Sequence, residues 1–322
     1  MRDPYDYREV VPQFDRKLDY ISFGEIGGVG EMVYHTVKFK RYELDADDNG
    51  YFMRPVCQQS GDSFKNPDVT FTGQEVLASL MNLAKEINDP AATIPYTDLI
   101  EAWCLQHFHP YAIDNLYEFI SDESYSDEEL GFVMEKEAAF GIDDFMQELQ
   151  RLYNATVLYL ALRDYVRGDL TTARDLYMEG RFFDTPPFFE KFKNSDHQIE
   201  NIPANEGERL QRVLFDMIPE FRMKLAFDRY GSIVYAAVVN SVFDIAWYTF
   251  SRLVADDAPE DDVDLNSNLE IGHLVSCLCC GRYMFRRNNR QRYCAAPDCQ
   301  AARKRKNRRD CDARKRAAKT PK

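Results

Sequence analysis

Two closely spaced cysteine pairs near the end of the chain constrain its fold more than any other feature. The pairs are Cys277-x2-Cys280 and Cys294-x4-Cys299, and thirteen residues separate them. Four thiolates in two such pairs are what a tetrahedral structural zinc site requires. Gly281 suits the tight backbone after the first pair, because glycine readily adopts a positive φ. The sequence therefore predicts one zinc ion per chain, held by these four cysteines.

Two further residues beside this motif are potential ligands. Cys279 stands inside the first pair, and His273 lies four residues before the motif begins. We favour Cys280 over Cys279 because Gly281 and Arg282 follow it directly, as in a zinc knuckle. The sequence leaves open whether Cys279 or His273 replaces one of the four cysteines.

The order of the parts resembles a treble-clef zinc finger, with a knuckle, a basic hairpin, an aromatic-Cys-x4-Cys segment and a basic helix. More narrowly, residues 277–316 resemble the CGNR-type finger at the C-terminus of bacterial transcription regulators. Gln300, Ala301 and Ala302 follow Cys299 where that family has Gly-Asn-Arg, and the first cysteine pair is narrower here. The resemblance implies a treble-clef fold and a role in transcription, and any role of Gly-Asn-Arg itself does not carry over.

Charge is distributed very unevenly along the chain. Residues from 271 onward carry sixteen Lys or Arg and three Asp or Glu, whereas the remainder carries 24 and 51. The two parts therefore have net charges of +13 and −27, and a basic tail on an acidic body indicates contact with nucleic acid or another polyanion. The basic residues predicted to make this contact are Arg282, Arg286, Arg287, Arg290, Arg292, Arg303, Lys304, Arg305, Lys306, Arg308 and Arg309.

The run of acidic residues from Asp256 to Asp264 predicts a solvated linker and a domain boundary. We expect a body over residues 1–255, an acidic linker over 256–270, and a zinc finger with a basic helix over 271–322. Hydrophobic residues make up 45% of the chain, which is enough for the body to form a packed core rather than remain disordered.

The body is predicted to be mainly α-helical with a small N-terminal β-hairpin. Residues 32–44 and 51–57 alternate in polarity around a turn signal at 47–50, which predicts the hairpin. Pro55 predicts that the second strand is short or lies at an edge. The Gly-rich stretch at 24–30 lacks the Lys-Ser/Thr of a phosphate-binding loop and is interpreted as a turn.

Apolar residues at helical spacing predict the helices of the body. The predicted segments are 72–87, 96–108, 113–120, 126–134, 145–162, 170–178, 206–227 with a break at Pro219, and 231–254. The last is apolar enough to compare with a membrane span. Because Asn240, Asp244 and Arg252 interrupt it, we interpret it as a buried central helix.

No catalytic signature stands out, and we expect a protein that is not an enzyme. Cys104 with His107 could form a nucleophile and base, and His107 with His109 could hold a metal, but both spacings are common without function. Clustered rather than dispersed cysteines and an N-terminus without an apolar signal core predict a cytoplasmic protein.

These features lead to three functional hypotheses. In the first, the finger binds nucleic acid, with duplex DNA favoured, and the body senses a small-molecule ligand or mediates self-association. In the second, the basic finger binds an acidic protein partner or the body's own acidic surface. In the third, which we disfavour, the helical body is an enzyme. Binding to duplex DNA that weakens with salt would separate the first from the second.

Overall fold

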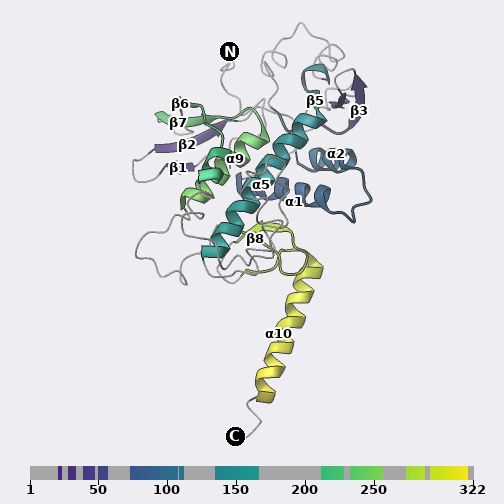
Figure 1. The fold of residues 1–322 in the computed structure, drawn as a ribbon, viewed down its shortest axis with the longest axis vertical. Helices are drawn as coiled ribbons and strands as arrows, with labels where there is room; N and C mark the ends of the chain where they lie inside the picture. Colours follow the sequence, from purple (N-terminus) through teal and green to yellow (C-terminus); the bar gives the residue numbers. More distant parts are fainter. Residues whose placement is uncertain are drawn as a thin grey trace, which may run out of the picture. The chain divides into compact units, whose positions relative to one another are not determined.

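The computed structural model describes residues 21–23, 28–33, 39–47, 50–56, 73–107, 109–111, 135–166, 212–227, 233–256, 273–286 and 291–317. The chain divides into two compact units, residues 1–254 and 255–322 (Figure 1). The fold is mostly helical, with a small antiparallel hairpin near the N-terminus and a cluster of four cysteines near the C-terminus, as the sequence predicts.

The predicted hairpin is formed by β3 (Tyr42–Asp47) and β4 (Gly50–Pro55), which pair antiparallel from Tyr42 opposite Pro55 to Asp47 opposite Gly50. Gly50 has a φ of 129°, which glycine adopts without strain and which permits the tight turn. The first strand begins at Tyr42, ten residues later than the alternating pattern suggests. The strand β5 (Phe140–Gly141) pairs with the other side of β4, so β4 is central rather than at an edge. Pro55 is tolerated because it ends the strand beyond the pairing with β5.

A second sheet corrects three sequence-based expectations. It contains β1 (Ile21–Phe23), β2 (Gly28–Val33), β6 (Met223–Phe227) and β7 (Ile233–Val238) in the order β1-β2-β7-β6. The expected turn at 24–30 therefore runs into β2, and the helix expected over 206–227 is helical only over 212–217 within the described residues. The helix expected over 231–254 begins with β7 instead. Short apolar runs do not distinguish strand from helix by periodicity, and the β-branched residues of β7 favour a strand.

Three other main helices of the body agree with the sequence-based expectation, namely α1 (Gly73–Asn88), α2 (Tyr96–Gln106) and α5 (Ile142–Val166). Of the helix expected over 231–254, only the second part is helical, as α9 (Val242–Asp256). The helices expected over 113–120, 126–134 and 170–178, and residues 257–264 of the acidic linker, lie outside the described residues. Among the helices that are described, none is both long and apolar enough to span a bilayer.

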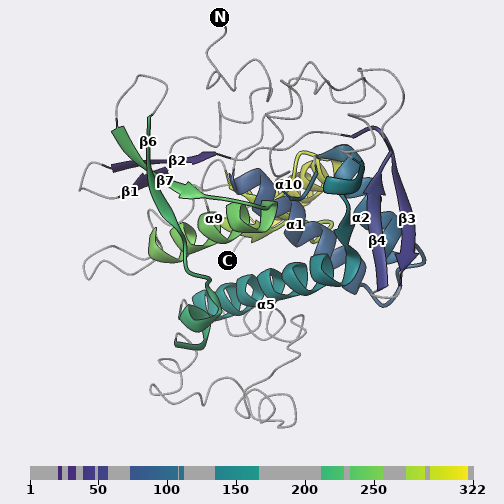
Figure 2. The same ribbon diagram turned by 90° about the horizontal axis from the view of Figure 1, so that it is seen from above.

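Aromatic side chains join these helices into the core of the body. Helix α1 lies beside α5 (Figure 2). Phe145 of α5 meets Phe243 of α9 with 5.1 Å between ring centroids, and Tyr159 meets Phe250 at 5.7 Å. All four rings are at most 6% exposed. Edge-to-face pairs of this kind add to the stabilisation from buried area, by about 0.5–1.5 kcal/mol each.

His109 is buried where the hairpin meets the end of α2. Its ring stacks on Tyr42 at 6.2 Å and meets Phe39 and Phe140 edge-on at 5.4 and 5.5 Å. Its Nδ1 lies 3.3 Å from the Tyr42 hydroxyl. Burial lowers the pKa of His109 from 6.5 to about 3, because an imidazolium would lose its hydration there.

This neutral histidine should make the body less stable as the pH falls. Below pH 6.5 the unfolded chain binds a proton at His109 that the folded chain does not, so stability decreases continuously from pH 6.5 towards pH 3. Between pH 7.5 and 5.5 we expect this residue alone to lower the free energy of unfolding by about 1.4 kcal/mol.

Urea unfolding of His109→Phe should show a smaller loss of unfolding free energy over this interval than the native protein. Tyr42→Phe is the matched control and should retain the native pH dependence, since burial rather than the hydroxyl sets the pKa. Equal slopes for His109→Phe and the native protein would contradict the assignment.

Candidate metal centre

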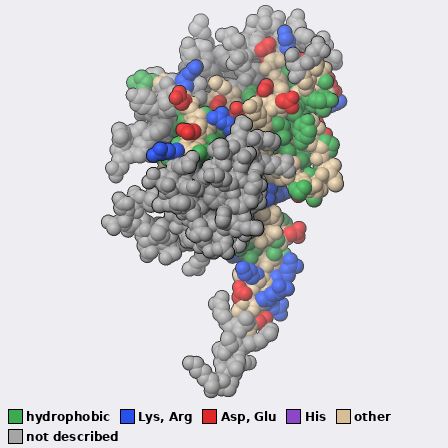
Figure 3. Space-filling model, viewed as in Figure 1, with side chains coloured by type: hydrophobic (Ala, Val, Ile, Leu, Met, Phe, Trp, Pro, Cys, Tyr) green, Lys and Arg blue, Asp and Glu red, His purple; other side chains and the backbone are tan. Residues whose placement is uncertain are grey.

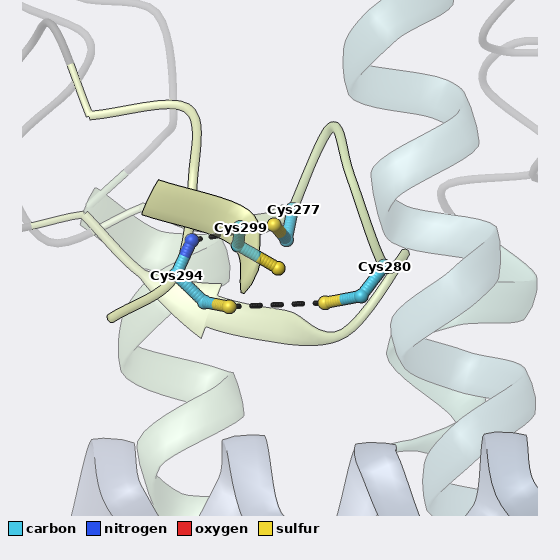
Figure 4. A group of neighbouring side chains, drawn as sticks. All are labelled: Cys277, Cys280, Cys294 and Cys299. Carbon is cyan, nitrogen blue, oxygen red and sulfur yellow. Dashed lines mark hydrogen bonds between the residues drawn. The ribbon is translucent and has the colours of Figure 1, made fainter. Parts of the chain in front are cut away.

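The first cysteine pair lies in the turn of a short hairpin. Strands β8 (Leu274–Ser276) and β9 (Tyr283–Phe285) pair antiparallel, with Ser276 opposite Tyr283. The ladder continues into the turn, where the Cys277 amide donates to the Arg282 carbonyl at 2.8 Å. The Gly281 amide donates to the Cys277 carbonyl at 2.9 Å, and Gly281 has the predicted positive φ, 71°. This conformation turns the backbone so that Cys277 and Cys280 direct their sulfurs to the same side (Figure 4).

The second pair lies at the start of α10 (Pro297–Ala317). Pro297 suits the first helical position because its missing amide proton has no acceptor there. Asp298 places a negative charge at the positive end of the helix. Cys299 follows in the same first turn, and the side-chain amide of Gln300 donates to the Cys294 carbonyl. The helix start therefore holds both Cys294 and Cys299 in place.

The four sulfur atoms form one compact group. All lie within 4.8 Å of one another, and the Cys280 and Cys294 sulfurs are 3.7 Å apart. A tetrahedral zinc with bonds of about 2.3 Å requires sulfur atoms separated by about 3.8 Å. Cys277 and Cys299 are 2% and 3% exposed. The geometry therefore fits a tetrahedral metal ion with two buried and two more accessible ligands (Figure 4).

The pKa values of three of these thiols are shifted in ways that a bound cation would change. Burial raises the pKa of Cys277, but the amides of Cys280, Cys294 and Cys279 outweigh it and lower that pKa to about 6. Burial raises the pKa of Cys294, and hydrogen bonding with Cys294 raises the pKa of Cys299. One thiolate therefore forms readily and discourages ionisation of its neighbours. A divalent cation would reverse this effect and hold all four as thiolates.

The two alternative ligands lie outside this group. Cys279 is exposed and is not one of the four sulfurs that converge, although hydrogen bonding with its side chain is among the causes that raise the pKa of Cys299. His273 accepts a hydrogen bond at its backbone carbonyl from the Arg286 amide, 3.0 Å away. Within the described part of the chain, the four cysteines are the only group of three or more His, Cys, Asp or Glu residues that could hold a metal ion.

The residues considered for catalysis have structural surroundings. Cys104 is fully buried, and burial raises the pKa of its thiol, which disfavours the nucleophilic thiolate. The His107 amide donates to the Trp103 carbonyl at the end of α2, and its ring packs on Trp103 with centroids 5.0 Å apart. His109 belongs to the aromatic cluster of the core. None of these contacts resembles a nucleophile held by a base.

The predicted basic surface follows the metal group along the chain. In α10 the side chains of residues 303–312 are all exposed, and Lys and Arg side chains gather along this helix (Figure 3). In the hairpin region, Arg282 and Arg292 are exposed and Arg286 is half-buried. Arg287 and Arg290 lie outside the described residues. The exposed basic residues of the helix are Arg303, Lys304, Arg305, Lys306, Arg308 and Arg309.

The sequence does not single out Leu278, an exposed residue near the four cysteines. Leu278 lies between Cys277 and Cys279 at the tip of the knuckle, and the residue is 57% exposed. A single leucine between cysteines carries no periodic signal, so the only clue in the sequence is its place in a turn otherwise made of ligands and small or polar residues.

Comparison of the chain with protein-family models, with curated proteins and with solved structures finds no match. The convergence of the four cysteine sulfurs is therefore what identifies this candidate metal centre.

Proposed function

We propose that the protein binds nucleic acid through a zinc finger formed by residues 273–317, and that duplex DNA is its target. The observation that carries this proposal is the exposure of all six Lys and Arg residues between 303 and 309, immediately after the metal group. Zinc is the metal proposed, because four cysteine sulfurs in a tetrahedral arrangement suit it best. Its role would be structural, since four protein ligands leave no open position for a substrate.

The basic helix has the properties of a surface for a polyanion rather than of a core helix. Its 21 residues extend about 31 Å at a rise of 1.5 Å per residue. Basic side chains occur on all its sides, so it lacks an apolar stripe for packing. A helix of this kind fits the major groove of DNA, where Lys and Arg neutralise phosphates and reach base edges. The metal group would hold its first turn rigidly against the hairpin.

The finer parts of the proposal come from the resemblance to the CGNR-type finger. A knuckle in a hairpin followed by two ligands at a helix start is compatible with a treble-clef arrangement. By analogy with that family, the protein would regulate transcription, and its helical body would sense a ligand or mediate association. By the same analogy, the body would contribute binding rather than catalysis.

Titration with duplex DNA over a range of salt concentrations tests this proposal. Each phosphate contact contributes roughly 0.9 to the slope of log affinity against log salt. Arg309→Ala should therefore lower the slope by roughly one, whereas Arg309→Lys, the matched control, should keep it. Absence of binding to duplex DNA at low salt would overturn the proposal. Binding of an acidic protein without binding of DNA would favour the second hypothesis, in which the finger recognises an acidic partner.

A further inference from the structure

The turn between β8 and β9, at the tip of the knuckle, exposes a surface that does not belong to the basic helix α10. Leu278 lies at this tip and is 57% exposed. The hairpin core nearby already contains buried apolar side chains, since Leu274 and Tyr283 are 0% and 2% exposed. Leu278 is therefore an apolar side chain directed to solvent although an apolar interior exists within the same unit. A single exposed apolar residue is ordinary on a protein surface, so its interest depends on which residues lie next to it.

Backbone hydrogen bonds join the segment around Leu278 to two exposed arginines. The Leu278 amide donates to the Arg292 carbonyl at 3.0 Å, which places these two residues on adjacent segments. The preceding residue, Cys277, donates its amide to the Arg282 carbonyl at 2.8 Å. Arg282 and Arg292 are both exposed. The backbone of the turn thus pairs Leu278 with one exposed arginine and the residue before it with another. We name Leu278, Arg282 and Arg292 the knuckle tip.

We infer that the knuckle tip is a second contact with duplex DNA, in which Leu278 packs against bases from the minor groove and the two arginines bind the flanking phosphates. This inference rests on the proposed function. Proteins that bind the minor groove combine arginine or lysine with an apolar wedge, often leucine, that partly unstacks a base step. The knuckle tip has this composition, and it differs from α10, whose exposed residues 303–309 contain no apolar side chain.

A metal ion bound by the four cysteines would make the knuckle tip rigid. Cys277 and Cys280, two of the candidate ligands, lie on either side of Leu278 in the sequence, and the Cys294 amide donates to the Cys277 sulfur at 3.3 Å. Both arginine carbonyls are held by the backbone hydrogen bonds of the turn. A side chain on a preorganised turn loses little conformational freedom on binding, so its apolar contact is not offset by ordering of the loop.

The salt dependence of binding separates this contact from those of the basic helix. An apolar contact depends little on counterions, so Leu278→Ala in the full-length zinc protein should weaken duplex binding by about tenfold at every salt concentration. The slope of log affinity against log salt should stay the same. Arg282→Ala should instead lower the slope by roughly one. Leu278→Met retains a wedge and should bind like the native protein, while Cys279→Ala controls for changes elsewhere in the turn. A labelled duplex should also bend less with Leu278→Ala than with native protein.

The outcomes distinguish this inference from the proposed function. In one outcome, the native protein binds duplex DNA and Leu278→Ala, with full zinc content, binds it equally well. This result would overturn the knuckle-tip contact and leave the proposed function intact. Failure of the native protein to bind duplex DNA would overturn both. Zinc content is measured for each variant. If Leu278→Ala loses zinc, Leu278→Gln replaces it, because glutamine is uncharged and of similar length. Leu278→Gln should bind more weakly than Leu278→Met if the side chain enters the groove.

Discussion

Replacement of Cys294 by Ser should remove the bound zinc and unfold the finger while the body keeps its own unfolding transition. The sulfurs of Cys280 and Cys294 are 3.7 Å apart, so the site loses one corner of its tetrahedron. For structural zinc sites of this kind, metal binding supplies about 10–16 kcal/mol of apparent free energy at pH 7 and is inseparable from folding. The hairpin β8–β9 has only three residues in each strand and cannot supply a comparable apolar core.

Elemental analysis of the purified protein and thermal unfolding followed by circular dichroism measure this effect. Cys279→Ser is the matched control, because Cys279 is exposed in the same turn and lies outside the converging group. It should retain one zinc per chain and the native unfolding curve. Full zinc content in Cys294→Ser would contradict the ligand assignment, and native protein with no metal would contradict the metal centre as a whole.

A fragment containing residues 265–322 should bind duplex DNA more tightly than the full-length protein at low salt. The body up to residue 270 has a net charge of −27 and is repelled by phosphates, whereas the remaining residues carry +13 and are attracted. At roughly 50 mM salt we expect the fragment to bind ten- to a hundredfold more tightly. The difference should shrink as salt rises, because the Debye length falls to about 8 Å at physiological ionic strength.

Competition binding with both proteins on the same duplex measures this difference. The acidic linker offers an internal comparison, since Asp261, Asp262 and Asp264 can be changed to Asn in the full-length protein. These changes should recover part of the affinity if the linker itself competes with DNA for the basic helix. Equal affinities of fragment and full-length protein at every salt concentration would remove the claim that the acidic body weakens binding.

The cysteine group could be predicted from the sequence because its determinants are local. A pair of cysteines separated by two residues can reach one ion only through a tight turn, and Gly281 supplies the positive φ that this turn needs. Four such ligands leave few alternative arrangements, so spacing alone indicated a metal site. The helix α1 was predictable for a related reason, since it repeats its buried residues at the period of one helical face. In α5, by contrast, residues 152–161 are buried on every side of the helix.

The second sheet could not be predicted in the same way. Its parallel pair joins Glu31 of β2 to Ala236 of β7, two segments that are far apart in the sequence. Whether a short apolar run becomes a strand depends on the partner that accepts its backbone hydrogen bonds, and this partner is absent from the local pattern. The run at 231–254 was therefore interpreted as one helix, although its first part pairs in the sheet and only its second part forms α9.

The sequence by itself determined the composition of the finger, namely four sulfur ligands followed by a dense run of positive charge. These properties depend on residue type and short-range spacing. Only the tertiary structure decided which of the remaining side chains are buried and which face solvent. Burial places His109 among three aromatic rings and lowers its pKa, whereas the turn of the knuckle leaves Leu278 exposed. Both outcomes depend on segments brought together by folding, because desolvation and exposure are properties of the packed chain rather than of a residue or its neighbours in sequence.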